Sequence, residues 1–112
     1  MSIAVELADL PDAIARRGPG AFLVTIGEGG PHVVSVSVAI IGGHLDMGAG
    51  RRTARNVAAR PAVALLWPHG VDHPDDSLLV DGTASLADDD DRLTVTPSSA
   101  ILHRSGGVGG TC

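Results

Sequence analysis

The segment from His32 to Ile41 most constrains the fold, because its side chains alternate as they do in a β-strand. A glycine-rich link at residues 27–31 precedes it and Gly42-Gly43 follows it, and both links are typical of hairpin turns. The segment therefore predicts an antiparallel sheet with tight connections. One face would carry Val34, Val36, Val38 and Ile40, and the other the small residues Ser35, Ser37 and Ala39.

That small-residue face has two interpretations. It is either a surface for close sheet packing or solvent, or a floor on which a flat ligand can lie. Alternation alone favours the packing or solvent interpretation.

Similar β-rich runs predict further strands, with Gly82 as a candidate bulge. Two short helices are expected, at residues 4–17 and at 54–60, the second capped by Thr53 and ended by Pro61. The strand–helix alternation of a doubly wound sheet is missing, so we expect one small, mainly β, antiparallel barrel over residues 1–104. A flexible glycine-rich tail is expected at 105–112. The other predicted strands are 21–26, 44–48, 62–67, 77–86, 92–96 and 98–103.

Composition limits the type of core, the cysteine chemistry and the cellular location expected for this domain. With 112 residues and only Phe22 and Trp67 as aromatics, the core must be aliphatic, and a partner subunit is expected to complete it. Cys112 is the only cysteine, which excludes an intramolecular disulfide and a cysteine zinc site. No run approaches the roughly 18 apolar residues of a membrane span, and the N-terminus does not read as a signal peptide. We therefore expect a cytoplasmic protein with no membrane segment.

Positive charge is concentrated in one short stretch. The formal net charge is −5, yet half of the eight basic residues, Arg51, Arg52, Arg55 and Arg60, fall between Gly48 and Arg60. The acidic balance disfavours non-specific nucleic-acid binding. A strand, a glycine turn and a helix start can together present N–H groups and guanidinium forks to an anion such as phosphate. The alternative is that these arginines pair with the acidic loops.

Other motifs indicate no catalytic or metal site. The loop at 69–76 holds His69, His73 and three aspartates but no helix to set a histidine pair in register, so a solvated acidic loop is favoured over a metal site. Asp88 to Asp91 lacks the spacing of an EF-hand and is interpreted as a solvated turn. There is no G-x-S-x-G elbow and no tyrosine. No catalytic residue is identified.

Four ordered segments together resemble the pyridoxamine 5′-phosphate oxidase-like family, the flavin- and deazaflavin-binding split β-barrels of Greek-key type. The resemblance covers roughly residues 20–103, and its most specific part is the Arg-Asn-Val-x-x-x-Pro-x-Val-Ala run from Arg55 to Ala64. The segments are Pro31-His-Val-Val-Ser-Val-Ser-Val, Gly43-His-Leu-Asp-Met, Gly50-Arg-Arg-Thr-Ala-Arg-Asn-Val and Arg60-Pro-Ala-Val-Ala-Leu-Leu-Trp.

The resemblance implies a homodimer with two cofactor sites at the subunit interface. The small-residue strand face then becomes a floor for the cofactor ring. By this resemblance the ring lies along Ser35, Val36 and Ser37, and Met47, Gly48 and Ala49 border it. The cofactor phosphate meets Arg51, Arg52, Thr53 and Arg55. Many members carry lysine where this chain has Thr53, so the contact at that position is expected to be weaker or differently made.

The function implied is a flavin-type oxidoreductase that uses FMN to transfer hydride to or from a small unsaturated or quinone-like substrate. Coenzyme F-420, a deazaflavin, is the alternative cofactor. Two other hypotheses stay open: a non-catalytic flavin or anion carrier, and a barrel that has lost its cofactor. Vitamin B6 oxidation is not expected, because the sequence lacks the C-terminal segment that helps bind pyridoxamine phosphate.

Overall fold

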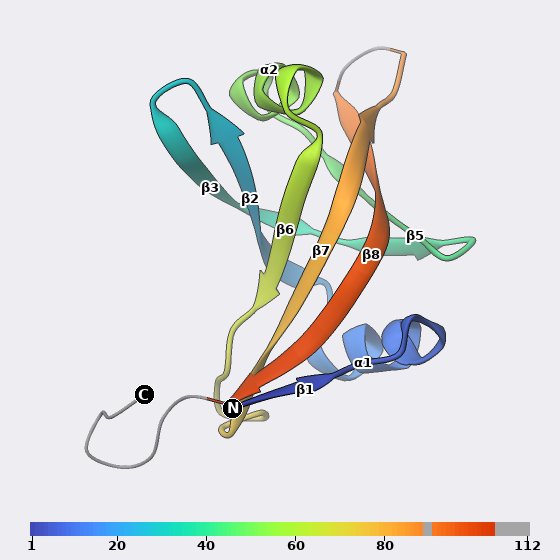
Figure 1. Cartoon of the computed structure of the whole chain (residues 1–112). Coiled ribbons are helices and arrows are strands. Elements are labelled where there is room, and N and C mark those ends of the chain that lie inside the picture. Colours follow the sequence, from blue (N-terminus) through green and yellow to red (C-terminus); the bar gives the residue numbers. More distant parts are fainter. Residues whose placement is uncertain (89–90, 105–112) are drawn as a thin grey trace.

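The computed structural model describes residues 1–88 and 91–104. In this part of the chain, eight antiparallel strands form one curled sheet, accompanied by two short α-helices and one 3-10 turn (Figure 1). The strands are β1 (Ser2–Ala4), β2 (Gly20–Gly27), β3 (Gly30–Ser37), β4 (Ala39–Ile41), β5 (His44–Gly48), β6 (Ala62–Trp67), β7 (Asp76–Leu86) and β8 (Arg92–Arg104). The helical elements are η1 (Leu7–Asp9), α1 (Leu10–Arg17) and α2 (Arg51–Ala59).

The sheet curls because two strands that follow each other in the sequence form its two edges. The strand order is β3-β2-β6-β7-β8-β5-β4, so β3 and β4 lie at opposite ends. Only Val38 separates them in the sequence, and its buried backbone N–H donates to the carbonyl of Pro19 at 2.9 Å. The chain therefore passes from one edge to the other and closes the sheet into a half-open barrel. This confirms the predicted barrel with two short helices, but the single strand expected over 32–41 is broken at Val38.

The core inside this sheet is aliphatic, as predicted. Side chains that alternate along β2, β6, β7 and β8 fill it. Trp67 is also fully buried, and its indole N–H donates to the carbonyl of Gly18 at 3.0 Å, which satisfies the polar atom of a buried aromatic. The largest fully buried aliphatic side chains are Leu23, Leu45, Met47, Leu65, Leu78 and Leu93.

The prediction of one helix over residues 4–17 is wrong in its first half. Residues Ser2–Ala4 form β1, which pairs with the end of β8, and α1 begins only at Leu10. Pro11 falls in the first turn of α1, where its missing N–H costs no helical hydrogen bond. The backbone bonds that β8 offers to β1 outweigh the local helical pattern.

The second helix was also placed imperfectly. It begins at Arg51 with Gly50 as its N-cap, and no side chain caps it. Thr53 is therefore not a cap; it lies within α2 and is buried. The helix turns this residue toward the sheet because Thr53, Asn56 and Val57 share the face that packs on the barrel.

Two predicted C-terminal strands form one. β8 runs unbroken through Pro97, so the separate strands at 92–96 and 98–103 are a single element. Pro97 lies opposite Gly82, where the register shifts between Asp81 and Gly82, which confirms the candidate bulge. A proline is tolerated here because the bulge interrupts the ladder.

Two predicted segments include residues that the structure does not describe. The acidic turn at 88–91 lies partly, and the tail at 105–112 wholly, outside the described residues. Neither α-helix in the described ranges is long and apolar enough to cross a membrane.

Candidate functional site

Helix α2 lies across one end of the barrel, beside the turn that joins β2 to β3 (Figure 1). Its buried face holds Thr53, Ala54, Asn56 and Val57, and its arginines are exposed. Successive residues of an α-helix point about 100° apart. Arg51 and Arg52, adjacent in the sequence, are therefore directed to different sides of α2.

A buried polar contact fixes the position of α2. The side-chain amide of Asn56 donates to the hydroxyl of Thr25 on β2, with an Nδ2–Oγ1 distance of 3.0 Å. Gly27 lies so close that a Cβ at this position would be 2.9 Å from Asn56 Oδ1. A larger residue at the end of β2 would therefore require the hydrogen-bonded Asn56 side chain to shift, and glycine avoids this.

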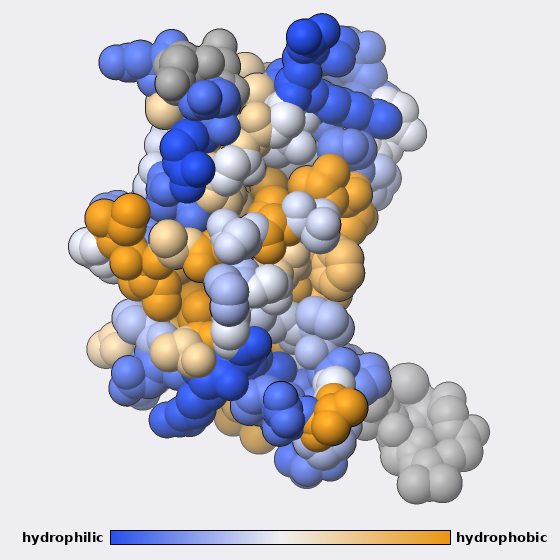
Figure 2. All heavy atoms as spheres, turned by 180° about the vertical axis from the view of Figure 1, so that it is seen from behind, coloured by the Kyte–Doolittle hydropathy of each residue, from blue (hydrophilic) through white to orange (hydrophobic). Residues whose placement is uncertain are grey.

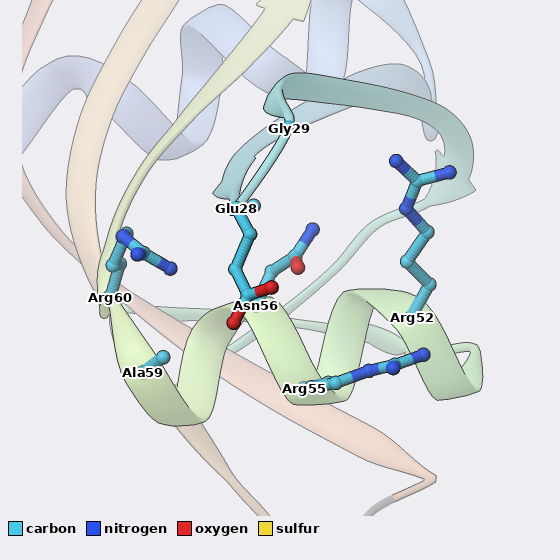
Figure 3. Close-up of a pocket in the computed structure, with 8 residues that line it drawn as sticks. Glu28, Gly29, Arg52, Arg55, Asn56, Ala59 and Arg60 are labelled. Atoms are coloured by element: carbon cyan, nitrogen blue, oxygen red, sulfur yellow. The ribbon is translucent and has the colours of Figure 1, made fainter.

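The first of two hollows beside α2, here called the hairpin hollow, lies between the helix and the β2–β3 turn. It has a volume of about 230 Å³, and Figure 3 shows basic side chains around it with Asn56 at its base. Glu28 projects from the turn above the helix. The lining residues are Gly27, Glu28, Gly29, Arg52, Arg55, Asn56, Ala59 and Arg60.

The second hollow, here called the β5 hollow, is wider and follows the end of β5. Its volume is about 910 Å³. Arg51 lines only this hollow, Arg52 only the hairpin hollow, and Arg55 lines both. The other lining residues are Ala49, Ala54, Ala58, Leu86 and Asp91.

The arginines between Arg51 and Arg60 differ from Arg17 and Arg92 in that they form no ion pair with a described residue. Arg17 forms an ion pair with Asp76, and Arg92 forms one with Asp46. Within residues 1–88 and 91–104, no ion pair involves the four arginines from Arg51 to Arg60. The alternative that they pair with the acidic loops therefore finds no support in the described part of the chain. An uncompensated basic group of this kind is suited to an external anion.

The structure brings together only part of the residue set predicted to hold the cofactor. Ala49, Arg51 and Arg55 share the β5 hollow, next to the exposed Gly48. Arg52 faces the hairpin hollow instead. Met47 and Thr53 are buried and line neither hollow.

The β3 residues of that set lie on a separate surface. Ser35 and Ser37 are exposed on the outer face of β3, and Val36 is half-buried on the inner face. None of the three lines either hollow. However, β3 contacts β5, so the floor suggested by β3 and the β5 hollow belong to one region of the barrel.

Sequence reasoning did not assign most of the lining residues to the site, among them Arg60, Asn56 and Glu28. Arg60 and Asn56 lie in the Arg55–Ala64 run that the sequence analysis singled out, but the sequence does not show which way their side chains point. Glu28 carried no signal, because only the sheet geometry places the β2–β3 turn against α2.

The histidine- and aspartate-containing loop serves a structural role. The ring Nε2 of His73 donates to the carbonyl of Arg16 at 3.1 Å, and the Arg17 guanidinium bonds the carboxylate and the carbonyl of Asp76. These contacts attach the loop to the end of α1 at His73 and Asp76, while the rest of residues 69–76 is exposed, as predicted for a solvated loop. In the described ranges, no group of three or more His, Cys, Asp or Glu side chains is placed to hold a metal ion.

Solved structures share this architecture. A Listeria innocua protein, provisionally named a pyridoxamine 5′-phosphate oxidase, has a TM-score of 0.70 and 21% identity, over 89% of this chain and 100% of that one. An F-420 reductase has a TM-score of 0.63 and 24% identity, and the match covers 80% of this chain and 94% of the reductase. An FAD-binding protein of Mesorhizobium loti has a TM-score of 0.67 and 17% identity, and the match covers 91% of this chain and 96% of that protein. The fold is that of the pyridoxamine 5′-phosphate oxidase-like split barrels.

This split-barrel assignment confirms the resemblance at the level of the fold. Because these identities lie below 25%, the ligand has to be argued from this chain's own residues. Sequence relatives add no activity: uncharacterized proteins of Mycobacterium bovis and Mycobacterium tuberculosis are each 40% identical in an alignment of length 110 that covers 92% of this chain. The chain spans 61% of the length of each. No profile of a known protein family matches the chain.

Proposed function

We propose that the protein binds a flavin-type cofactor, FMN or alternatively the deazaflavin F-420, and acts as an oxidoreductase. One observation carries the proposal: an acidic split barrel exposes arginines on α2 that have no carboxylate partner among the described residues. The phosphate of such a cofactor would supply the missing negative charge. Similar folds in proteins named as FAD-binding or as F-420 reductase support the same class of ligand.

The residues beside the β5 hollow fit this cofactor. Its volume of about 910 Å³ is at the upper end of the ~300–1,000 Å³ of small-molecule sites. Arg51 and Arg55 would hold the phosphate, and the small residues Gly48 and Ala49 leave room beside it. When bound, the cofactor supplies hydride transfer, while the protein binds and orients it and excludes water.

The cofactor ring is proposed to lie along β3, over Ser35 and Ser37 on its outer face, with the backbone of Val36 between them. Phe22 pairs with Ser35 across the β2–β3 ladder, so both occupy the outer face of the sheet. That face is apolar, with Phe22 40% and Val33 56% exposed. Figure 2 also shows hydrophobic side chains across the middle of the molecule on its rear side. An apolar exposed face suits a subunit interface, and a second copy that covered it would enclose the same strand.

A carrier is the second candidate function. Among the residues that line the β5 hollow, Asp91 is the only one with a carboxylate; the others are arginines, alanines and a leucine. Proton transfer to a substrate would then depend largely on water. This observation favours binding without turnover over a dedicated acid–base mechanism.

FMN and F-420 titrations of the purified protein test the proposal. We expect binding at micromolar concentration, and at least about tenfold weaker binding by an Arg51→Gln/Arg55→Gln variant, because each lost charged hydrogen bond contributes about 1.5–3 kcal/mol. Arg104→Gln, an exposed arginine at the end of β8, is the matched control and should bind as the native protein does. The proposal fails if neither cofactor binds at micromolar concentration. Reduction of bound cofactor and its reoxidation by added quinones separates an enzyme from a carrier.

A further inference from the structure

The hairpin hollow is lined by arginines that a single phosphate beside Arg51 would not contact. Arg52 and Arg60 line this hollow and do not line the β5 hollow. Helix α2 separates the two sides, and an α-helix with its side chains is about 10–12 Å across. One phosphate beside Arg51 therefore leaves Arg52 and Arg60 without an anionic partner.

The base of the hairpin hollow is closely packed and hydrogen-bonded. Asn56 is only 7% exposed, and its amide is held by the hydroxyl of Thr25. Gly27 packs against the same side chain, so the β2 end of the hollow cannot move toward the helix. A ligand group that enters here meets a preformed surface, which lowers the ordering cost of binding.

The charge balance of the hollow favours an anion. Arg52, Arg55 and Arg60 surround it, and Glu28 is the single acidic residue of its lining. Glu28 forms no ion pair with a described residue. Three like charges around about 230 Å³ repel one another, and a bound phosphate or carboxylate would relieve that repulsion.

We infer that the hairpin hollow is a second anion site, which receives a second phosphate or a carboxylate of the ligand whose first phosphate lies beside Arg51. This rests on the proposed function and sharpens it. The preferred ligand is a flavin or deazaflavin that carries two separate anionic groups, and FMN uses only half of the site. Glu28 opposes the second group electrostatically and so limits its affinity.

Two variants test the site from opposite directions. Arg60→Gln removes a positive charge and Glu28→Gln removes the opposing negative charge, and both residues are exposed. Each is titrated with FMN, FAD and F-420 at low and moderate salt, with Arg104→Gln as the control. We expect Arg60→Gln to weaken F-420 binding about tenfold, because the phosphate and the carboxylates of F-420 are separate groups, and to leave FMN unchanged. FAD, whose two phosphates share one bridging oxygen, should respond much less than F-420. Glu28→Gln should strengthen binding of the same two-anion ligand about threefold, and low salt should enlarge both effects.

Other outcomes overturn the inference. It is wrong if Arg60→Gln changes no ligand's affinity, or if it weakens FMN as much as F-420. Circular dichroism and thermal unfolding of each variant exclude a folding defect.

Failure of the proposed function has a different signature. If the native protein binds none of the three cofactors, inorganic pyrophosphate is the remaining probe, measured by calorimetry. Pyrophosphate binding that Arg60→Gln weakens and Glu28→Gln strengthens supports the anion site by itself. Absence of pyrophosphate binding in that case overturns the site as well.

Discussion

The amide of Asn56 donates a hydrogen bond to the hydroxyl of Thr25, and this contact joins α2 to the interior of the sheet. Both residues are buried. The arginines on the opposite face of α2 therefore depend on an interior contact for their positions, although they themselves are exposed to solvent.

Thr25→Val removes the acceptor of this bond and leaves the buried amide of Asn56 unpaired. We expect the free energy of unfolding to fall by about 1–3 kcal/mol, the usual cost of an unsatisfied buried polar group. Urea unfolding measures it. Thr83→Val, at an exposed position on β7, is the control and should change stability by no more than about 0.5 kcal/mol. Equal effects of the two substitutions would contradict a special role for the Asn56 bond.

Gly27→Ala tests the close approach of β2 to α2. The new Cβ would lie 2.9 Å from Asn56 Oδ1, and Asn56 is held by Thr25, so it cannot yield easily. We expect a loss of about 1–3 kcal/mol, typical of overpacking, together with weaker cofactor binding because α2 is displaced. In the control, Gly29→Ala, no atom lies within 4 Å of the new Cβ. Unchanged stability in Gly27→Ala would show that α2 is less firmly packed than the structure indicates.

The two ion pairs should differ sharply in their contributions. The Arg17 side chain is 7% exposed and also donates to the carbonyls of Trp67 and Asp76, whereas the Arg92 side chain is 51% exposed. Arg17→Gln leaves Asp76 and two carbonyls poorly satisfied, and we expect it to cost about 3 kcal/mol or more. Arg92→Gln should cost less than about 1 kcal/mol. Thermal and urea unfolding of the two variants would refute this ranking if their losses were equal.

A charged substitution on the outer face of β2 tests the proposed dimer. Phe22→Glu places a carboxylate on the apolar face shared with Val33, and burying it against a second subunit would be costly. Light scattering coupled to size exclusion should show a dimer for the native protein and a monomer for the variant. Val71→Glu, on a 98% exposed residue of the loop between β6 and β7, is the control and should stay dimeric. A native protein that is monomeric at micromolar concentration would refute the interface.

Much of the sheet follows from local patterns. The β-rich runs at residues 21–26, 62–67 and 77–86 predicted strands, and the structure shows alternating burial along each of them. The bulge at Gly82 was also readable, because a glycine inside a strand run marks a break in the ladder. The concentration of arginines between Gly48 and Arg60 was evident from the residue order alone.

Long-range geometry decided the rest. β1 exists because β8 offers an unpaired edge to residues 97 or more positions away, and no local pattern contains that partner. The sequence shows Arg51 and Arg52 as a pair, but helix geometry directs them into separate hollows. Likewise, Glu28 lines the same hollow as Arg52 and Arg60 only because the folded sheet brings the β2–β3 turn beside α2. The sequence by itself determined where the strands and the positive charge lie; the tertiary structure decided which charges face one another, since that depends on how the barrel closes.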